Sequence, residues 1–266
     1  MSELPTRRTL LGGALGVAAL PVVTAPGAAA LPLPAPGPSA ASGDPYEVLV
    51  FSRTAGFRHD AIDEGITALR ELGAENGFQV TATEDATAFT GDSLARFKVV
   101  VFLNTTGDVL GAAQQAAFEG YIAGGGAYVG VHSAADTEYD WPWYGGLVGA
   151  YFHSHPQIQS ATVVVEDRTH DATAHLAATW QRTDEWYNYR TSPRAGAHVL
   201  ASLDESSYSG GTMNGDHPIA WCKEYAGGRS FYTGGGHTAE SYAQADFRRH
   251  LLGGIRWAAG TAGSGM

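Results

Sequence analysis

Apolar residues in the first half of the chain follow two different spacings, which predict two kinds of element. Between residues 62 and 76 they recur every three or four positions, which predicts a helix that Gly77 ends. Compact apolar runs without that spacing predict buried strands over residues 47–52, 78–83, 98–103 and 127–131. Further helical segments are predicted over residues 93–97 and 111–123.

The second half has a more mixed pattern. Strands are predicted over residues 161–166, 198–202, 217–224 and 228–233, and a helix over residues 243–258 closes the chain. The first of these strands alternates apolar and polar positions, as in a strand exposed on one side. Strands that alternate with helices favour right-handed crossovers and a parallel sheet with helices on both faces. The predicted fold class is therefore α/β, a three-layer sandwich around a mostly parallel, flavodoxin-like sheet.

The first residues have the features of an export signal rather than of a fold. Arg7 and Arg8 precede a short apolar stretch over residues 10–23, and Ala28-Ala29-Ala30 follows it. This order predicts a Tat-type signal peptide over residues 1–30 and a secreted, extracellular protein. A membrane anchor is the alternative, but a membrane span needs about 20 clean apolar residues.

After this signal we expect a Pro/Ala-rich linker over residues 31–45 and one α/β domain over residues 46–260. The full chain has a net charge of −11 and one cysteine, Cys222, which can form no internal disulfide. An acidic surface repels phosphate backbones, so we expect no nucleic-acid partner. We also expect no nucleotide cofactor, and no membrane contact in the mature form.

Polar loops that carry histidine follow several of the predicted strands. Arg58 and His59 come after the first strand, residues 132–136 after the fourth, and His237 after three glycines near the end. In open parallel sheets, ligands bind beyond the carboxyl ends of the strands. We therefore expect one cleft formed by these loops, in which Arg58 and His59 contact the substrate.

The segment Gly130-Val-His-Ser-Ala134 has the outline of a nucleophile elbow, a strand followed by a sharp turn and a functional side chain. The imidazole of His132 at this turn is predicted to act as a base or a metal ligand, with a structural histidine as the alternative. Ser133 is the weaker candidate for a nucleophile, because it would face elsewhere. We assign catalytic roles to His132, to Asp136 on the same loop and to His237.

Two other segments carry candidate chemistry. His153 and His155 are two positions apart, so in an extended segment both would project from one face, a spacing suited to zinc or another divalent metal. Solvated loop histidines are the alternative. Asp184 and Glu185 are adjacent carboxylates that are predicted to act as catalytic acid and base. One exposed carboxylate beside a core tryptophan is the alternative.

Aromatic residues near these groups favour a sugar ligand. Trp186 and Tyr187 follow the two carboxylates, and Trp143 lies in an aromatic-rich segment. Their faces can stack on the C–H groups of a sugar ring. A hydrophobic lid packed on the core is the alternative for Trp143. His217, at the start of a predicted strand, completes the predicted substrate-binding residues.

Several of these motifs, in this order, resemble the ThuA-like (trehalose utilisation) family. They are Phe57-Arg58-His59, Gly130-x-His132-x-x-x-Asp136, Phe152-His153-x-His155, Asp184-Glu185-Trp186-Tyr187, His217-Pro218-Ile219-x-Trp221, Gly228-Arg229-x-Phe231-Tyr232-Thr233 and Gly236-His237-Thr238. The resemblance covers residues 47–258. It implies the class I glutamine-amidotransferase-like fold, with the amidotransferase cysteine replaced by His132, and a role in sugar metabolism.

Together these observations favour an exported enzyme that cleaves or modifies glycosides or polysaccharides, so the expected partner is a carbohydrate. The reaction would be hydrolysis, or elimination from a uronic acid in which Arg58 or a divalent metal neutralises the developing negative charge. A non-catalytic carbohydrate-binding module is the alternative. A third hypothesis is an amidohydrolase relic, but the elbow has no cysteine and Cys222 lies in a predicted strand.

Overall fold

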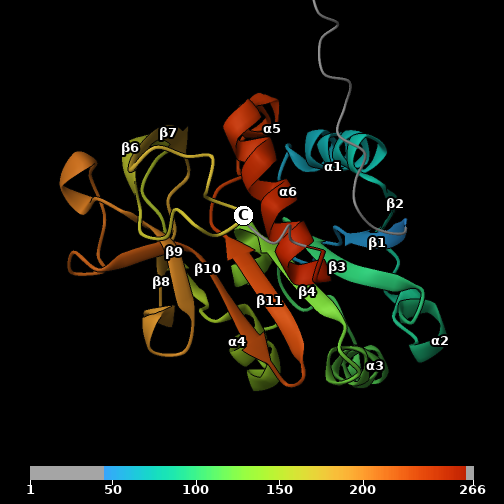
Figure 1. Ribbon diagram of the computed structural model, residues 1–266. Helices are drawn as coiled ribbons and strands as arrows, with labels where there is room; N and C mark the ends of the chain where they lie inside the picture. The colour runs from blue at the N-terminus through green and yellow to red at the C-terminus, as the bar shows by residue number, and fades with distance from the viewer. Residues whose placement is uncertain (1–44, 262–266) are drawn as a thin grey trace, which may run out of the picture. The chain divides into compact units, whose positions relative to one another are not determined.

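A nine-stranded sheet forms the centre of the protein (Figure 1). The structure is a computed structural model that describes residues 45–261. The strands are β1 (Tyr46–Phe51), β2 (Phe78–Thr83), β3 (Phe97–Leu103), β4 (Ala127–Val131), β5 (Phe152–Ser154), β6 (Gln159–Val165), β7 (Thr179–Asp184), β8 (Asn188–Tyr189), β9 (His198–Leu203), β10 (His217–Tyr225) and β11 (Gly228–Thr233). The helices are α1 (Ile62–Asn76), α2 (Gly91–Leu94), α3 (Ala112–Ala123), α4 (Pro142–Val148), α5 (Ala239–Ala243) and α6 (Ala245–Ala259). The predicted signal peptide and residues 31–44 of the predicted linker lie outside the described residues.

The strand order β2-β1-β3-β4-β11-β10-β9-β6-β7 divides the sheet into two halves. The first five strands pair in parallel, and the remaining pairs are antiparallel. The direction reverses at the hairpin between β10 and β11, where Ala226 and Gly227 both have positive φ, as a two-residue turn that matches the strand twist requires. β5 and β8 form a separate two-stranded sheet.

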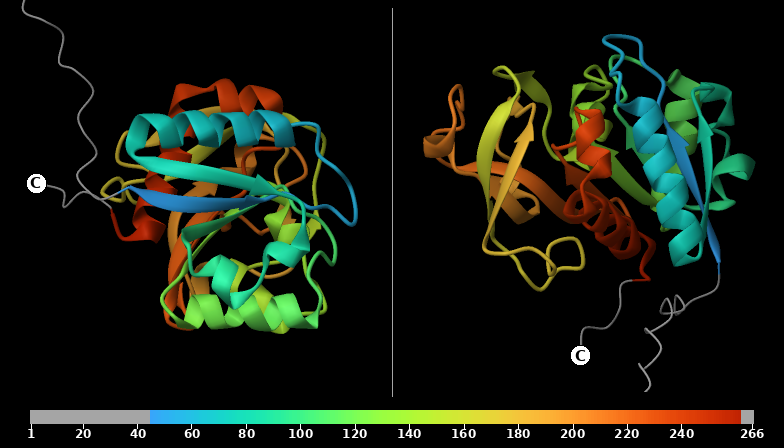
Figure 2. Two further views of the ribbon diagram at one scale, coloured as in Figure 1. Left: turned by 90° about the vertical axis from the view of Figure 1, so that its right-hand side faces the viewer. Right: turned by 90° about the horizontal axis from the view of Figure 1, so that it is seen from above.

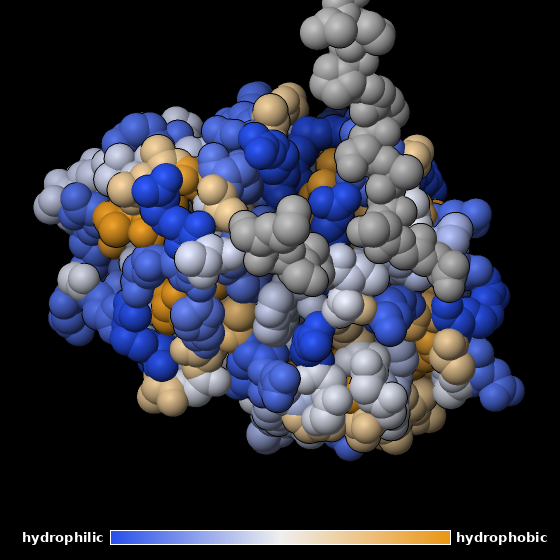
Figure 3. All heavy atoms as spheres, in the orientation of Figure 1, coloured by the Kyte–Doolittle hydropathy of each residue, from blue (hydrophilic) through white to orange (hydrophobic). Residues whose placement is uncertain are grey.

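Helices cover both faces of the parallel half. In Figure 1 and in the left view of Figure 2, α1, α5 and α6 lie on one side of these strands and α2, α3 and α4 on the other. The central strands β3, β4 and β11 are almost wholly buried, as the apolar sequences of β3 and β4 predict. The face in Figure 3 is largely hydrophilic, with hydrophobic residues in small separate areas. This arrangement confirms the predicted α/β three-layer fold with a mostly parallel core.

Most predicted elements of the first half are confirmed. The helix over 62–76 and the strands over 78–83 and 127–131 have the predicted bounds, and Gly77 ends the helix in the left-handed conformation. The turn predicted over 93–97 was placed too late, because the chain has already entered β3 at Phe97.

The second half departs further from the prediction. The helix predicted over 243–258 is confirmed as α6, which begins after the extended Gln244. Three strands and two helices were missed: β5, β7, β8, α4 and α5. Of these, β7 matters most, because it leads directly to Glu185.

Two parallel strands end in strained corners that direct the chain into the site. Asn104 after β3 and His132 after β4 both have a φ of 50°, a left-handed conformation that is uncommon for residues other than glycine. The side-chain amide of Asn104 donates to the carbonyl of Gly236, 3.0 Å away. Strain of this kind persists only where the surrounding structure fixes it, and it occurs mostly at functional sites.

None of the helices within residues 45–261 combines the length and the apolar character needed to cross a membrane.

We predict that His250, on α6, makes stability depend on pH. It is fully buried, its Nδ1–H donates to the carbonyl of Ala172 at 2.8 Å, and Trp180, Phe231 and Phe247 surround the ring. Burial, with a smaller contribution from the charge of Arg182, lowers the pKa of His250 from 6.5 to about 3.

The sign follows from the proton uptake of the two states. Below pH 6.5 His250 is protonated in the unfolded chain, whereas in the native state it stays neutral down to about pH 3. The free energy of unfolding therefore falls as the pH falls through this window. Urea unfolding of the wild type and of His250→Leu from pH 7 to pH 4 measures it. The wild type should lose about 1.4 kcal/mol per pH unit more than the variant. Parallel pH profiles would contradict the prediction.

Candidate functional site

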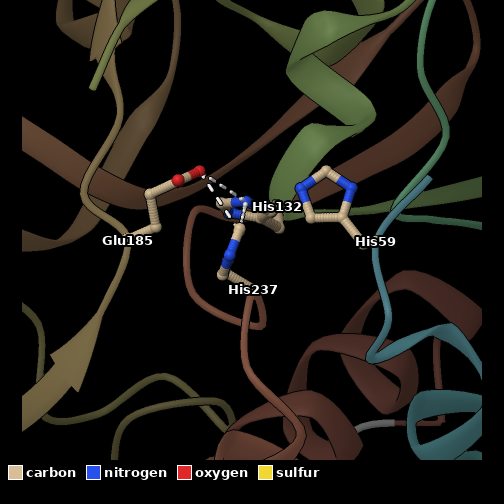
Figure 4. Close-up of side chains that lie close together, drawn as sticks. All are labelled: His59, His132, Glu185 and His237. Atoms are coloured by element: carbon tan, nitrogen blue, oxygen red, sulfur yellow. Dashed lines mark hydrogen bonds and ion pairs between the residues drawn. The ribbon is translucent and has the colours of Figure 1, made fainter. Parts of the chain in front are cut away.

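Three imidazoles and one carboxylate meet above the carboxyl ends of the parallel strands. They belong to His59, His132, Glu185 and His237, whose possible ligand atoms all lie within 4.8 Å of one another. We call these four residues the His/Glu cluster. They come from the loops after β1, β4, β7 and β11, and Figure 4 shows the side chains pointing toward one another. Residues far apart in the sequence thus converge, as predicted for His132, Glu185 and His237.

Three atoms of the cluster form an almost equilateral triangle. Nε2 of His132 lies 3.2 Å from Nδ1 of His237 and 3.4 Å from Oε2 of Glu185, and the last two atoms are 3.2 Å apart. Ligands that bind zinc tetrahedrally at its usual bond lengths are about 3.3–3.5 Å from one another. The spacing therefore fits a small divalent ion without rearrangement, although it does not identify the metal.

The backbone fixes the orientation of His132. Its Nδ1–H donates to the carbonyl of Gly234 at 2.9 Å, which leaves the lone pair of Nε2 directed into the cluster. A second hydrogen bond of this kind is what metal-binding histidines usually have. The hydroxyl of Tyr232 donates to the carbonyl of His132 at 2.7 Å and holds the elbow from below. A side chain at Gly130 would collide with Tyr128, so glycine is required in β4 two residues before His132.

The charges of the cluster depend on one another. Burial, together with the charges of the neighbouring His132 and His237, lowers the pKa of His59 to about 3, so His59 is neutral. Burial alone would raise the pKa of Glu185, but hydrogen bonds to His132 and His237 outweigh it and the pKa is lowered. For His237, burial opposes protonation, but Glu185 raises the pKa above its usual value. The cluster therefore offers an anionic carboxylate and a neutral imidazole to a cation.

Asp184 lies directly beneath the cluster rather than in it. Its side chain is fully buried, and both carboxylate oxygens accept hydrogen bonds. Five donors surround them: the guanidinium of Arg182, the hydroxyl of Ser241, and the backbone N–H groups of Glu185, Gly236 and His237. The carboxylate predicted as a catalytic acid or base therefore holds together the two loops that carry Glu185 and His237.

One side of the cluster is formed by Tyr187 and His155. The ring of Tyr187 lies 4.3 Å from that of His132 and stacks on that of His155. Nδ1 of His155 is 3.0 Å from Oε1 of Glu185, so the two oxygens of this carboxylate face opposite neighbours. His155 is exposed, and it marks the solvent side of the site together with the partly exposed His237.

The predicted metal pair needs correction. Within residues 45–261, the group of His, Cys, Asp and Glu side chains close enough to hold a metal ion is the His/Glu cluster, which contains neither His153 nor His155. The strand β5 ends at Ser154, so the two histidines do not share an extended segment, and His153 is exposed to solvent. His59, predicted to bind substrate, belongs to the cluster instead.

Two other predicted substrate-binding residues support the core. Trp186 is buried and its indole N–H donates to the carbonyl of Gln159. His217 is buried between Glu205, the hydroxyl of Tyr208 and the carbonyl of Tyr187, so it positions the backbone of Tyr187.

The remaining predicted residues lie around the cluster or away from it. Arg58 is exposed and forms an ion pair with Glu84 at 2.8 Å. Asp136 is half-buried; burial raises its pKa, and the hydroxyl of Tyr139 donates to it. Trp143, on α4, stacks on Trp141.

Comparison with known proteins places the chain among related structures. The family model ThuA, described as trehalose utilisation, matches residues 47–258. A ThuA-like protein from Bacteroides uniformis is 26% identical, with 86% of this chain and 98% of that protein covered and a TM-score of 0.72. A ThuA-like protein from Parabacteroides merdae is 17% identical, with coverages of 84% and 93% and a TM-score of 0.68.

A more distant likeness concerns the fold alone. A beta-galactosidase from Bacillus circulans sp. alkalophilus is 14% identical, with 81% of this chain but 31% of that enzyme covered and a TM-score of 0.54. No curated protein matches the chain.

We predict that Asp184 has a structural role that can be measured without a substrate. Asp184→Ala leaves the buried guanidinium of Arg182 without its partner and should destabilise the protein by about 3–5 kcal/mol in urea unfolding. Glu84→Ala is the matched control, because it removes an exposed carboxylate paired with Arg58 and should cost about 1 kcal/mol or less. Equal stabilities of the two variants would refute the role.

Proposed function

We propose that this chain, which belongs to the ThuA family, is a metal-dependent enzyme that acts on a carbohydrate. The observation that carries the proposal is the triangle of ligand atoms from His132, His237 and Glu185, to which His59 adds a fourth group. The site lies where ligands bind in open parallel sheets, beyond the carboxyl ends of the strands.

The donor set supports a divalent transition metal such as zinc. Imidazole nitrogens suit zinc, copper, iron and nickel, whereas magnesium and calcium prefer sites made of oxygen. A divalent ion held there would act as a Lewis acid that polarises a substrate oxygen or a water molecule. His132 and Glu185 directly follow the strands β4 and β7, and Asp184 holds the backbone of His237, so these ligands are placed before any metal or substrate binds.

The protein's own groups orient the site and control its protons. The carbonyl of Gly234 holds His132, and Asp184 holds the backbone of His237. Oε1 of Glu185 faces His155 on the solvent side, which places a proton-transfer partner beside the carboxylate. The buried ring of Tyr187 forms an apolar wall that excludes water from one side of His132.

Of the two candidate reactions, we favour hydrolysis over elimination from a uronic acid. In elimination, Arg58 or a divalent metal would neutralise the substrate carboxylate; the Arg58 guanidinium forms an ion pair with Glu84, so this role would fall to the metal. Hydrolysis by two carboxylates of the Asp184–Glu185 pair has no support, because Asp184 is buried and fully hydrogen-bonded. Metal-assisted hydrolysis needs only the groups that face the cluster.

A non-catalytic carbohydrate-binding module is the second candidate, and the ionisable core of the site argues against it. Binding a sugar requires stacking and neutral hydrogen bonds, whereas three buried ionisable groups, one of them at the strained elbow of His132, are costly to maintain. The amidohydrolase relic has less support, because Cys222 is buried in β10 and burial raises its pKa to about 12.

The proposal includes export and action on an extracellular glycan. The order of twin arginine, short apolar stretch and small residues in the first thirty positions supports it. A protein that binds its metal in the cytoplasm suits the Tat route, which carries folded proteins.

We predict that the metal-free protein binds about one equivalent of Zn²⁺ through the cluster. In calorimetric titrations, His132→Ala and Glu185→Gln should weaken this binding by at least about a hundredfold, since each removes a ligand. His153→Ala is the matched control, an exposed histidine on nearby β5 that should bind zinc like the wild type. Loss of binding in His153→Ala with retention in His132→Ala would overturn the assignment.

We predict that the metal-loaded protein releases new reducing ends from a neutral oligosaccharide or polysaccharide. Glu185→Gln should lower the rate at least about a hundredfold, because it removes the charge that faces His132 and His155. In a parallel assay, acidic glycans are the substrates and the ultraviolet absorbance of unsaturated uronides is measured. Elimination would be shown instead if acidic glycans gave this absorbance while neutral glycans gave no reducing ends. Sugar binding without any product would favour the binding module.

We predict that replacement of Arg7 and Arg8 by lysine leaves the protein unexported. Secretion by a Tat-competent host, followed by immunoblotting of the culture medium, measures the effect. The wild type should appear there without its first residues, since a signal peptide is removed. Equal secretion of both proteins would contradict a Tat-type signal.

A further inference from the structure

One exposed aromatic side chain lies beside the cluster. In the described part of the chain, the large hydrophobic residues that face solvent are Phe57 at 66% exposure, Ile158 at 48% and Val164 at 39%. Single exposed hydrophobic residues are normal and need no explanation by themselves. Phe57 differs in being aromatic and in its position next to a candidate metal ligand.

The position of Phe57 follows from ring contacts that lead into the cluster. Its ring meets the ring of His59 edge-to-face, with centroids 4.9 Å apart. His59 in turn lies 4.9 Å from both His132 and His237. An aromatic face open to solvent therefore stands one side chain away from the candidate metal ligands.

The backbone holds Phe57 in place although the side chain is exposed. The hydroxyl of Thr106 donates to the carbonyl of Phe57 at 2.8 Å, and the N–H of Gly56 donates to the same hydroxyl at 3.2 Å. The N–H of Ala55 donates to the carbonyl of Thr106 at 2.7 Å. The loop after β1 is thus fastened to the loop after β3. A platform fixed before binding loses little conformational entropy when a ligand arrives.

The charges near Phe57 favour a neutral ligand. Arg58, the adjacent cation, forms an exposed ion pair with Glu84, and the neighbouring Asp60 is exposed and acidic, so these three side chains carry no net positive charge that would attract an acidic sugar. An aromatic face carries partial negative charge and attracts the weakly positive C–H groups on the face of a pyranose ring. Phenylalanine offers no hydrogen bond, so the hydroxyl groups of the sugar remain free to interact at the cluster.

We propose that Phe57 is the platform of a sugar-binding subsite, which stacks on one neutral pyranose ring while the adjoining part of the substrate reaches the His/Glu cluster. This inference rests on the proposed function and deepens it. Phe57 touches substrate away from the reacting bond, so it contributes to binding and to KM rather than to the chemical step.

The test measures sugar binding to the metal-loaded protein by calorimetry and by saturation-transfer NMR. The probes are trehalose, cellobiose, maltose and lactose, with digalacturonic acid as the acidic comparison. Phe57→Ala should weaken binding of the neutral probe that binds best by about tenfold, Phe57→Leu should weaken it less, and Phe57→Tyr should bind like the wild type. Zinc affinity and thermal stability should be unchanged, because the side chain is exposed.

Val164→Ala is the matched control. It also shortens an exposed hydrophobic side chain, but Val164 pairs with Thr179 at the start of β7, whereas the site lies at the other end of that strand. It should leave sugar binding unchanged. For a probe that is turned over, Phe57→Ala should raise KM and keep kcat.

The outcomes separate the two proposals. Unchanged sugar binding by Phe57→Ala, with the wild type binding a neutral probe, overturns the platform and leaves the proposed function intact. A wild type that binds zinc but none of the five sugars overturns both. Binding of digalacturonic acid alone overturns the neutral substrate class.

Discussion

Glu185 and His237 meet because the carboxylate of Asp184 ties their loops together. Asp184 ends β7, in the antiparallel half of the sheet, and it accepts the N–H groups of Gly236 and His237 from the loop after β11. The positive charge of Arg182 balances the Asp184 carboxylate within the core, so Asp184 needs no counter-ion from the His/Glu cluster. The carboxylate of Glu185 is therefore brought beside imidazoles that the parallel half supplies.

The cluster brings together imidazoles that disfavour one another's protonation. His59 is neutral because burial and the neighbouring imidazoles oppose a proton, and Glu185 stays ionised because its interactions with the neighbouring imidazoles outweigh the effect of burial. A divalent cation can bind the imidazole lone pairs and the carboxylate at the same time, whereas a proton cannot. The left-handed corner at His132 adds backbone strain. Binding of a metal would offset both costs, in the way that any ligand of the native state stabilises it.

The sequence was sufficient to predict the strands and helices of the parallel half of the sheet and the loops that follow its strands. Apolar runs and helical spacing are local signals, and loops after parallel strands must meet at one edge, so the convergence of His132 and His237 could be predicted. The different positions of Asp184, beneath the cluster, and Glu185, within it, could not be predicted from such local signals. Adjacent residues point in different directions, and which one faces the core depends on β7. Burial alternates along this strand, but its buried positions include Arg182 and Asp184, so its hydropathy pattern does not predict it. His153 and His155 failed for a related reason, because their spacing gives a shared face only if the strand continues past Ser154.

The elbow indicates which kinds of chemistry remain for this scaffold. A thiolate at the corner would permit acyl transfer, but His132 stands there, and its Nδ1–H is committed to the carbonyl of Gly234. Ser133, the neighbouring hydroxyl, is fully buried and lies within hydrogen-bond distance of His59. The His/Glu cluster itself contains no serine or cysteine, and Cys222 is buried. The groups that form the cluster therefore suit a reaction in which water or a hydroxyl group of the substrate is the nucleophile.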